Sequence, residues 1–223
     1  MGDDPQREVG STLAGRYGGP RADLSIARMS VAAAWNVQGD ATRTTLPADF
    51  ARMFGVPLPQ APNTTFRAVA ATGFAHSTGA AQGGRLIALW LGPRSWLLVE
   101  STRDAKPAQL VDFDGHRDAL NASGGALFDV SASRVAFTLR GAHAGDVLAR
   151  GCPLDFGLQA FAPGTCAQSV FGPVSTLFYR HIARDAFTLL VARSLSADAW
   201  HSLCRAAAPE GYVVAPPSML DAD

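Results

Sequence analysis

Several features that would assign a function directly are missing from this 223-residue sequence. Its 19 basic and 19 acidic residues leave no net charge, whereas binding to nucleic-acid phosphates needs a basic surface. No apolar run approaches the ~18 residues of a membrane span. The acidic, polar start of the chain also differs from a secretory signal peptide. We therefore expect no nucleic-acid partner, no membrane partner and a cytoplasmic location.

Motifs for metals and nucleotides are missing too. Cys152, Cys166 and Cys204 are an odd number without a C-x-x-C pair, which fits a reducing compartment and predicts neither a disulfide framework nor a zinc knuckle. The 5 histidines form no H-x-H or H-x-x-x-H pair, so no metal site is expected. Neither G-x-G-x-x-G nor a P-loop pattern occurs, so no cofactor-binding residue is assigned to this chain.

The composition is that of a globular protein, and the pattern of apolar residues predicts many strands. Apolar residues make up 48% of the chain and charged residues 17%, which is enough for a sizeable core. Apolar runs and alternation predict one or two strands in 24–36, and further strands at 66–71, 85–91, 96–99, 127–130, 134–140, 174–179 and 187–192. Helices are predicted at 47–54, 107–121, 142–150 and 196–207, the last with Ser196 as its N-cap.

The order of these elements predicts the fold class. Strands occur in pairs followed by helices and not in strict βαβ alternation, which favours an α+β fold with antiparallel sheets and helices packed on one face. Residues 1–20 contain few large apolar groups and several glycines, so we expect a flexible N-terminal arm. Residues 21–223 then form the folded domain, either as one body or as two α+β lobes of about 21–125 and 126–223.

The most informative segment runs from Asp129 to Asp155. An alternating strand leads into Gly141, a short amphipathic helix follows, and Gly151 ends that helix. The sequence C-P-L-D, at 152–155, comes directly after this glycine. A cysteine and an aspartate beside a glycine-ended helix are the kinds of residue that form a site.

Four segments together resemble the gamma subunit of heterotetrameric sarcosine oxidase. They are ALWLGPRSWLLV (88–99), DVS…RVAFTLRG (129–141), DVLARGCPLD (146–155) and FAPGTCAQS (161–169), and the resemblance covers about residues 66–207. That family is similar in fold to the folate-binding aminomethyltransferase domain, so the resemblance implies this fold here.

The resemblance also implies a role in a complex. Such complexes oxidatively demethylate sarcosine to glycine, produce hydrogen peroxide and pass the one-carbon unit to tetrahydrofolate. The implied partners are the alpha, beta and delta subunits. FAD, FMN, NAD, tetrahydrofolate and zinc are expected on those partners and none of them on this chain, which would be a non-catalytic structural subunit.

The family-motif positions are expected to be structural, with no catalytic residue among them. These positions are Gly92, Trp96, Asp129, Ser131, Arg134, Gly141, Gly151, Cys152, Pro153, Asp155, Pro163, Gly164 and Gln168.

Two aspartates keep a catalytic alternative open. Asp129 stands in a D-V-S motif similar to one in folate-dependent aminomethyltransferases, where it could bond a pterin-like ring, although an aspartate and a serine also cap turns. Asp155 stands where those enzymes carry an Asn-Asp pair, but the asparagine position is apolar here. The later acidic pair is also missing, because residues 170–180 hold no carboxylate. The alternative is an independent folate-dependent aminomethyltransferase-like enzyme.

Cysteine and tryptophan residues leave two further alternatives. The G-T-C-A-Q-S sequence around Cys166 faintly resembles folate-binding accessory proteins for iron–sulfur maturation, although a buried structural thiol explains it as well. Cys152 follows a helix C-terminus, whose dipole disfavours a thiolate. Trp90 and Trp96 flank a turn, either as core residues or as an exposed pair at a subunit interface.

Overall fold

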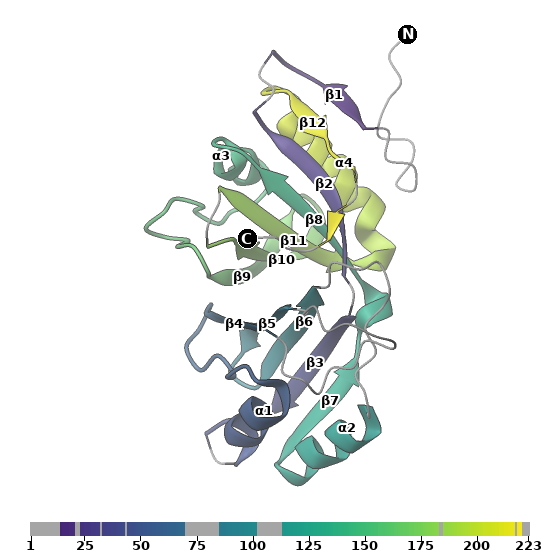
Figure 1. The fold of residues 1–223 in the computed structure, drawn as a ribbon. Coiled ribbons are helices and arrows are strands. Elements are labelled where there is room, and N and C mark those ends of the chain that lie inside the picture. The colour runs from purple at the N-terminus through teal and green to yellow at the C-terminus, as the bar shows by residue number, and fades with distance from the viewer. Residues whose placement is uncertain are drawn as a thin grey trace. The chain divides into compact units, whose positions relative to one another are not determined.

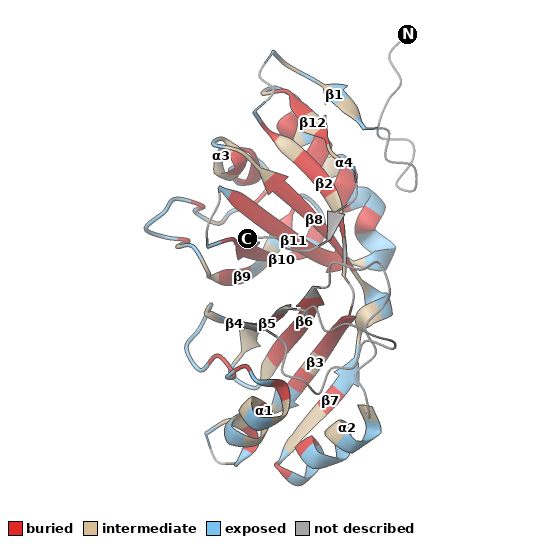
Figure 2. Ribbon diagram, in the orientation of Figure 1, coloured by how far each residue is buried: buried red, intermediate tan, exposed pale blue. Residues whose placement is uncertain are grey.

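The fold is described from a computed structural model. It describes residues 14–20, 23–31, 33–42, 44–69, 85–101, 113–182, 185–216 and 218–219. The chain forms two compact units, one of residues 31–132 and one of residues 1–30 with 133–223. We call them the central unit and the terminal unit (Figure 1). Each has its own sheet and its own buried core (Figure 2).

The central unit is a five-stranded antiparallel sheet with two helices. Its strand order is β4-β5-β6-β3-β7. The elements in chain order are β3 (Ala33–Gly39), α1 (Leu46–Phe54), β4 (Thr65–Val69), β5 (Arg85–Gly92), β6 (Ser95–Ser101), α2 (Phe113–Ala122) and β7 (Gly125–Asp129).

A tryptophan pair anchors the hairpin of the central unit. Trp90 in β5 lies directly opposite Trp96 in β6. Trp96 is fully buried, and its Nε1–H donates to the main-chain oxygen of Pro59 at 2.7 Å. Trp90 is partly buried and packs against the same core, so the core-packing interpretation of this pair is confirmed.

The start of α1 is tied to the end of α2 through Asp49. Its Oδ2 accepts hydrogen bonds from the Ser123 and Thr45 hydroxyls, both at 2.7 Å. Both bonds lower the pKa of Asp49 because they stabilise its charged carboxylate, and the bond from Ser123 has the larger effect. The opposite end of α1 stops at Gly55, whose φ of 67° is the left-handed conformation that ends many helices.

The terminal unit is an eight-stranded sheet with two helices. Along the sheet the order is β1-β12-β2-β8-β11-β10-β9, and β13 also pairs with β2. The elements in chain order are β1 (Gly15–Tyr17), β2 (Ser25–Ser30), β8 (Arg134–Arg140), α3 (Ala144–Ala149), β9 (Cys166–Phe171), β10 (Val174–Arg180), β11 (Ala186–Ala192), α4 (Ser196–Ala207), β12 (Tyr212–Val214) and β13 (Ser218–Met219).

The core of the terminal unit lies between this sheet and its helices. Both α3 and α4 contact β11 and one another. Val135, Phe137 and Leu139, the alternating face predicted for β8, belong to this core, where the Phe137 ring lies 5.5 Å from that of Trp200 in α4. The prediction of an α+β fold with antiparallel sheets is confirmed, with β12–β2 and β13–β2 as the parallel pairs.

The division into units differs from the expected lobes of 21–125 and 126–223. Strand β2 precedes the whole central unit in sequence, yet it pairs with β8, and β12 from the end of the chain pairs with β2. Residues 15–17 of the expected N-terminal arm form β1, which pairs with β12, while residues 1–13 lie outside the described part. These hydrogen bonds join segments far apart in sequence, so local patterns do not reveal them.

Some element boundaries also differ. Strands β1, β9, β12 and β13 were not predicted. Ser196 is the first residue of α4 and not its cap, since the cap position is Leu195 and no side chain bonds there. Helix α2 begins at Phe113, and residues 107–112 of the predicted helix lie outside the described part. No helix among the described residues is long and apolar enough to cross a membrane.

Candidate functional site

The Asp129 motif forms a tight turn at the end of β7. Asp129 Oδ1 accepts hydrogen bonds from the Ser131 main-chain N–H at 2.9 Å and from the Ser131 hydroxyl at 2.6 Å. The Ser131 oxygen in turn accepts the N–H of Ala34 at 2.9 Å, which attaches the turn to β3. Such bonds between side chain and main chain are typical of Asx turns. The exposed carboxylate and the hydroxyl therefore both serve the local backbone.

Gly141 and Gly151 lie at the two ends of α3, and close contacts explain both glycines. Gly141 has a φ of +133°, and a Cβ there would lie 2.3 Å from the main-chain oxygen of Asp23. Gly151 follows the last turn of α3, as expected, but lacks the left-handed φ common at that position. A Cβ at Gly151 would instead lie 2.6 Å from the buried ring of Phe171.

The cysteines of the motifs belong to the core of the terminal unit or lie fully buried beside it. Cys152 is buried within that core, and Cys166 in β9 has an exposed fraction of 0%. None of the three cysteines is part of a disulfide. A reactive thiol needs access to its substrate, so the buried position of Cys166 disfavours the iron–sulfur alternative.

The remaining motif residues shape strand ends and loops. Gly164 has a φ of +80°, which only glycine adopts readily, and its N–H donates to the main-chain oxygen of Arg180 at 2.9 Å. Pro163 precedes it in this turn, and Gln168 is exposed on β9. Arg134 starts β8, where its main-chain oxygen accepts a hydrogen bond from Arg193. A Cβ at Gly92 would meet no atom within 4 Å.

Arg180, at the end of β10, holds the loop that follows the C-P-L-D motif. Its side chain is buried, and Nη1 donates to the main-chain oxygens of Phe156 at 2.9 Å and Phe161 at 3.0 Å. Its guanidinium carbon lies 5.0 Å from the centre of the Phe187 ring, a cation–π contact. One buried cation thus fixes both ends of the segment 156–161 to the sheet.

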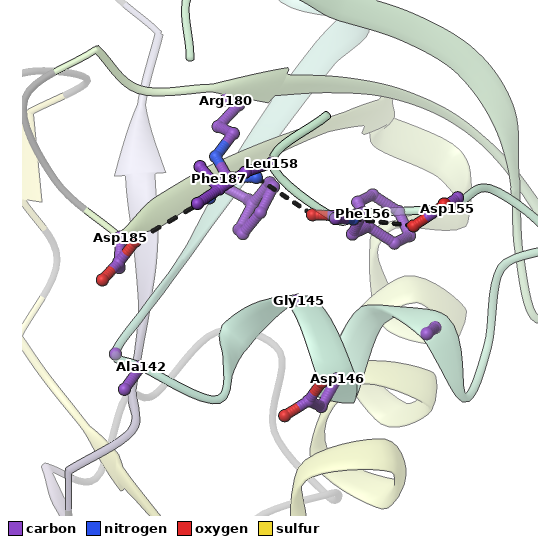
Figure 3. A pocket seen from close by; sticks show the side chains of 12 residues that line it. Ala142, Gly145, Asp146, Asp155, Phe156, Leu158, Arg180, Asp185 and Phe187 are labelled. Carbon is purple, nitrogen blue, oxygen red and sulfur yellow. Dashed lines mark hydrogen bonds and ion pairs between the residues drawn. The ribbon is translucent and has the colours of Figure 1, made fainter. Parts of the chain in front are cut away.

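A pocket of about 480 Å³ lies beside this loop. Figure 3 shows Gly145 and Asp146 of α3 across the pocket from Arg180 and Phe187. Asp155 also lines it, although Asp155 Oδ1 accepts the N–H of Gly157 at 2.8 Å, a second Asx turn. The pocket lining is Gly141, Ala142, Gly145, Asp146, Ala149, Asp155, Phe156, Gly157, Leu158, Arg180, Asp185 and Phe187.

A comparison with models of protein families identifies the family of this chain. The model of the sarcosine oxidase, gamma subunit family matches residues 39–209, which is well over half of the chain. The chain belongs to the sarcosine oxidase gamma subunit family. A comparison with curated proteins finds no match.

Two solved structures of other proteins have a fold similar to that of this gamma-subunit family member. A chain of the heterotetrameric sarcosine oxidase from Corynebacterium sp. U-96, in complex with pyrrole 2-carboxylate, has a TM-score of 0.67 and 21% identity, covering 87% of this chain and 88% of that one. The glycine cleavage system aminomethyltransferase T from Bartonella henselae has a TM-score of 0.60 and 16% identity, covering 89% of this chain. This chain spans 48% of the aminomethyltransferase, so it matches about half of that protein.

The aminomethyltransferase-like fold expected from the sequence is confirmed by this likeness. The motif residues are divided between the two units. Asp129 and Trp96 belong to the central unit, and Asp155 and Gly141 to the terminal unit. Among the described residues, no group of three or more histidine, cysteine and acidic side chains could hold a metal ion.

Two of the buried ionisable residues, Arg180 and Glu100, were not identified from the sequence. Arg180 ends an apolar strand without any local pattern that predicts its burial. Glu100 in β6 is fully buried, and burial raises its pKa from 4.5 to about 7. The signal for Glu100 was a single acid at the end of the apolar run S-W-L-L-V-E. Glu100 does not line the pocket of the terminal unit.

Proposed function

We propose that this chain is a non-catalytic structural subunit of a heterotetrameric sarcosine oxidase. The match of residues 39–209 to the gamma subunit family is the observation that carries the proposal. The complex would oxidatively demethylate sarcosine to glycine, form hydrogen peroxide and transfer the one-carbon unit to tetrahydrofolate. This chain would complete the assembly by packing against the other subunits.

The partners of the proposal are the alpha, beta and delta subunits of the complex. FAD, FMN, NAD, tetrahydrofolate and zinc would reside on them. The likeness to a chain of a heterotetrameric sarcosine oxidase over 87% of this chain supports an assembly of that kind.

The state of the two motif aspartates supports a non-catalytic role. A general base gains strength when it is partly desolvated and placed against substrate. Asp129 and Asp155 are both exposed, and each accepts a main-chain N–H two residues ahead. The segment 170–180, where the folate enzymes carry an acidic pair, instead provides Arg180, which holds a loop.

Co-expression tests the proposal. The tagged chain would be produced with the alpha, beta and delta subunits, purified through its tag and analysed by size-exclusion chromatography and by sarcosine-dependent hydrogen peroxide production. We expect one four-subunit peak with activity. The proposal fails if this chain elutes alone while the other three subunits form an active complex.

A folate-dependent enzyme acting alone is the second candidate. The likeness to aminomethyltransferase T over 89% of this chain favours it. Calorimetry with tetrahydrofolate on the isolated chain discriminates between the two candidates. Binding in the micromolar range that an Asp129→Ala variant loses, with its fold kept, would support the enzyme; no heat of binding supports the structural subunit.

A further inference from the structure

We draw no further inference here: the strongest candidate, the buried side-chain cluster of His181, Thr188 and Thr138 in the sheet of the terminal unit, carries nothing, because its side chains are closed to solvent and contact one another, and nothing among the described residues shows a ligand or partner that would reach them.

Discussion

Gly141, between β8 and α3, has no room for any side chain. Its φ of +133° is a conformation that residues with a Cβ rarely adopt, and a Cβ would lie 2.3 Å from the main-chain oxygen of Asp23. That oxygen belongs to the backbone that leads into β2, which is paired with β8, so it cannot turn aside as a side-chain end would. The Gly141 N–H also donates to the main-chain oxygen of Asp185 at 2.9 Å, which opposes a rotation of the peptide.

These contacts set the size of the effect of Gly141→Ala. A residue held in a sparsely populated conformation costs about 1–3 kcal/mol, and overpacking against a fixed neighbour costs about 1–3 kcal/mol more. The free energy of unfolding should fall by about 2–6 kcal/mol, a large part of the ~5–15 kcal/mol typical of a folded protein. At about 2–4 °C per kcal/mol, the melting temperature should fall by at least about 4 °C.

Two other motif glycines provide the comparison. Gly92→Ala is the control, because its Cβ would meet no atom within 4 Å and its φ is not positive, so stability should stay equal or rise by up to about 1 kcal/mol. Gly151→Ala should be destabilising, because the 2.6 Å contact is with the buried Phe171 ring, which has little freedom to move.

Thermal and urea unfolding, followed by far-UV circular dichroism, measure all three variants. The steric reasoning would be refuted if Gly141→Ala melted within about 1 °C of wild type. It would equally be refuted if Gly92→Ala lost as much stability as Gly141→Ala.

Three further predictions address buried polar groups. Glu100 should stay protonated in the folded state up to about pH 7 and ionise near 4.5 when unfolded, so stability should fall as pH rises through this window and then level off. Glu100→Gln removes this titration, so above pH 7 the free energy of unfolding of the variant should exceed that of wild type by up to about 3 kcal/mol. The difference should vanish near pH 4. Urea unfolding at a series of pH values measures it. Trp96→Phe leaves the Pro59 oxygen without its 2.7 Å donor, so the free energy of unfolding measured in urea should fall by about 1–3 kcal/mol. Trp90→Phe, at a partly buried position, is the control and should cost less. Equal losses of stability in the two variants would contradict the role of the Trp96 hydrogen bond. Arg180→Met leaves the oxygens of Phe156 and Phe161 without their donor and should cost about 2–4 kcal/mol, with faster proteolysis within 156–161; an unchanged digestion rate would show that the loop holds without Arg180.

Much of the fold could be predicted because its main strands carry short-range patterns. The run R-L-I-A-L-W-L and the turn residues after it predict β5 and the hairpin to β6. Alternation predicts that Val135, Phe137 and Leu139 share one face of β8, and these three belong to the core of the terminal unit; the opposite face, with Ala136 and Thr138, is buried as well. Strand β9 was not predicted. It is an edge strand in which Gln168 and Val170 are both exposed, so its apolar and polar residues do not alternate clearly.

The candidate site was predictable only as a set of motif positions. Asp155 was identified from its place after a glycine-ended helix, but the pocket that it lines also needs Arg180 and Asp185 from later in the chain. The Asx turns at Asp129 and Asp155 follow from local sequence, since each involves a partner two residues away. The burial of Arg180 depends on carbonyl groups up to 24 residues earlier in the chain, which no local pattern encodes.

The sequence by itself determined the fold class, the family motifs and the lack of an acidic pair in 170–180, because these depend on residue type and on spacing along the chain. Only the tertiary structure decided that β2 joins the sheet of the terminal unit and that Gly151 makes room for Phe171. It also decided that three aspartates share one pocket with a buried arginine. These features arise from contacts between distant segments, whose register is fixed when the whole sheet pairs and the core closes.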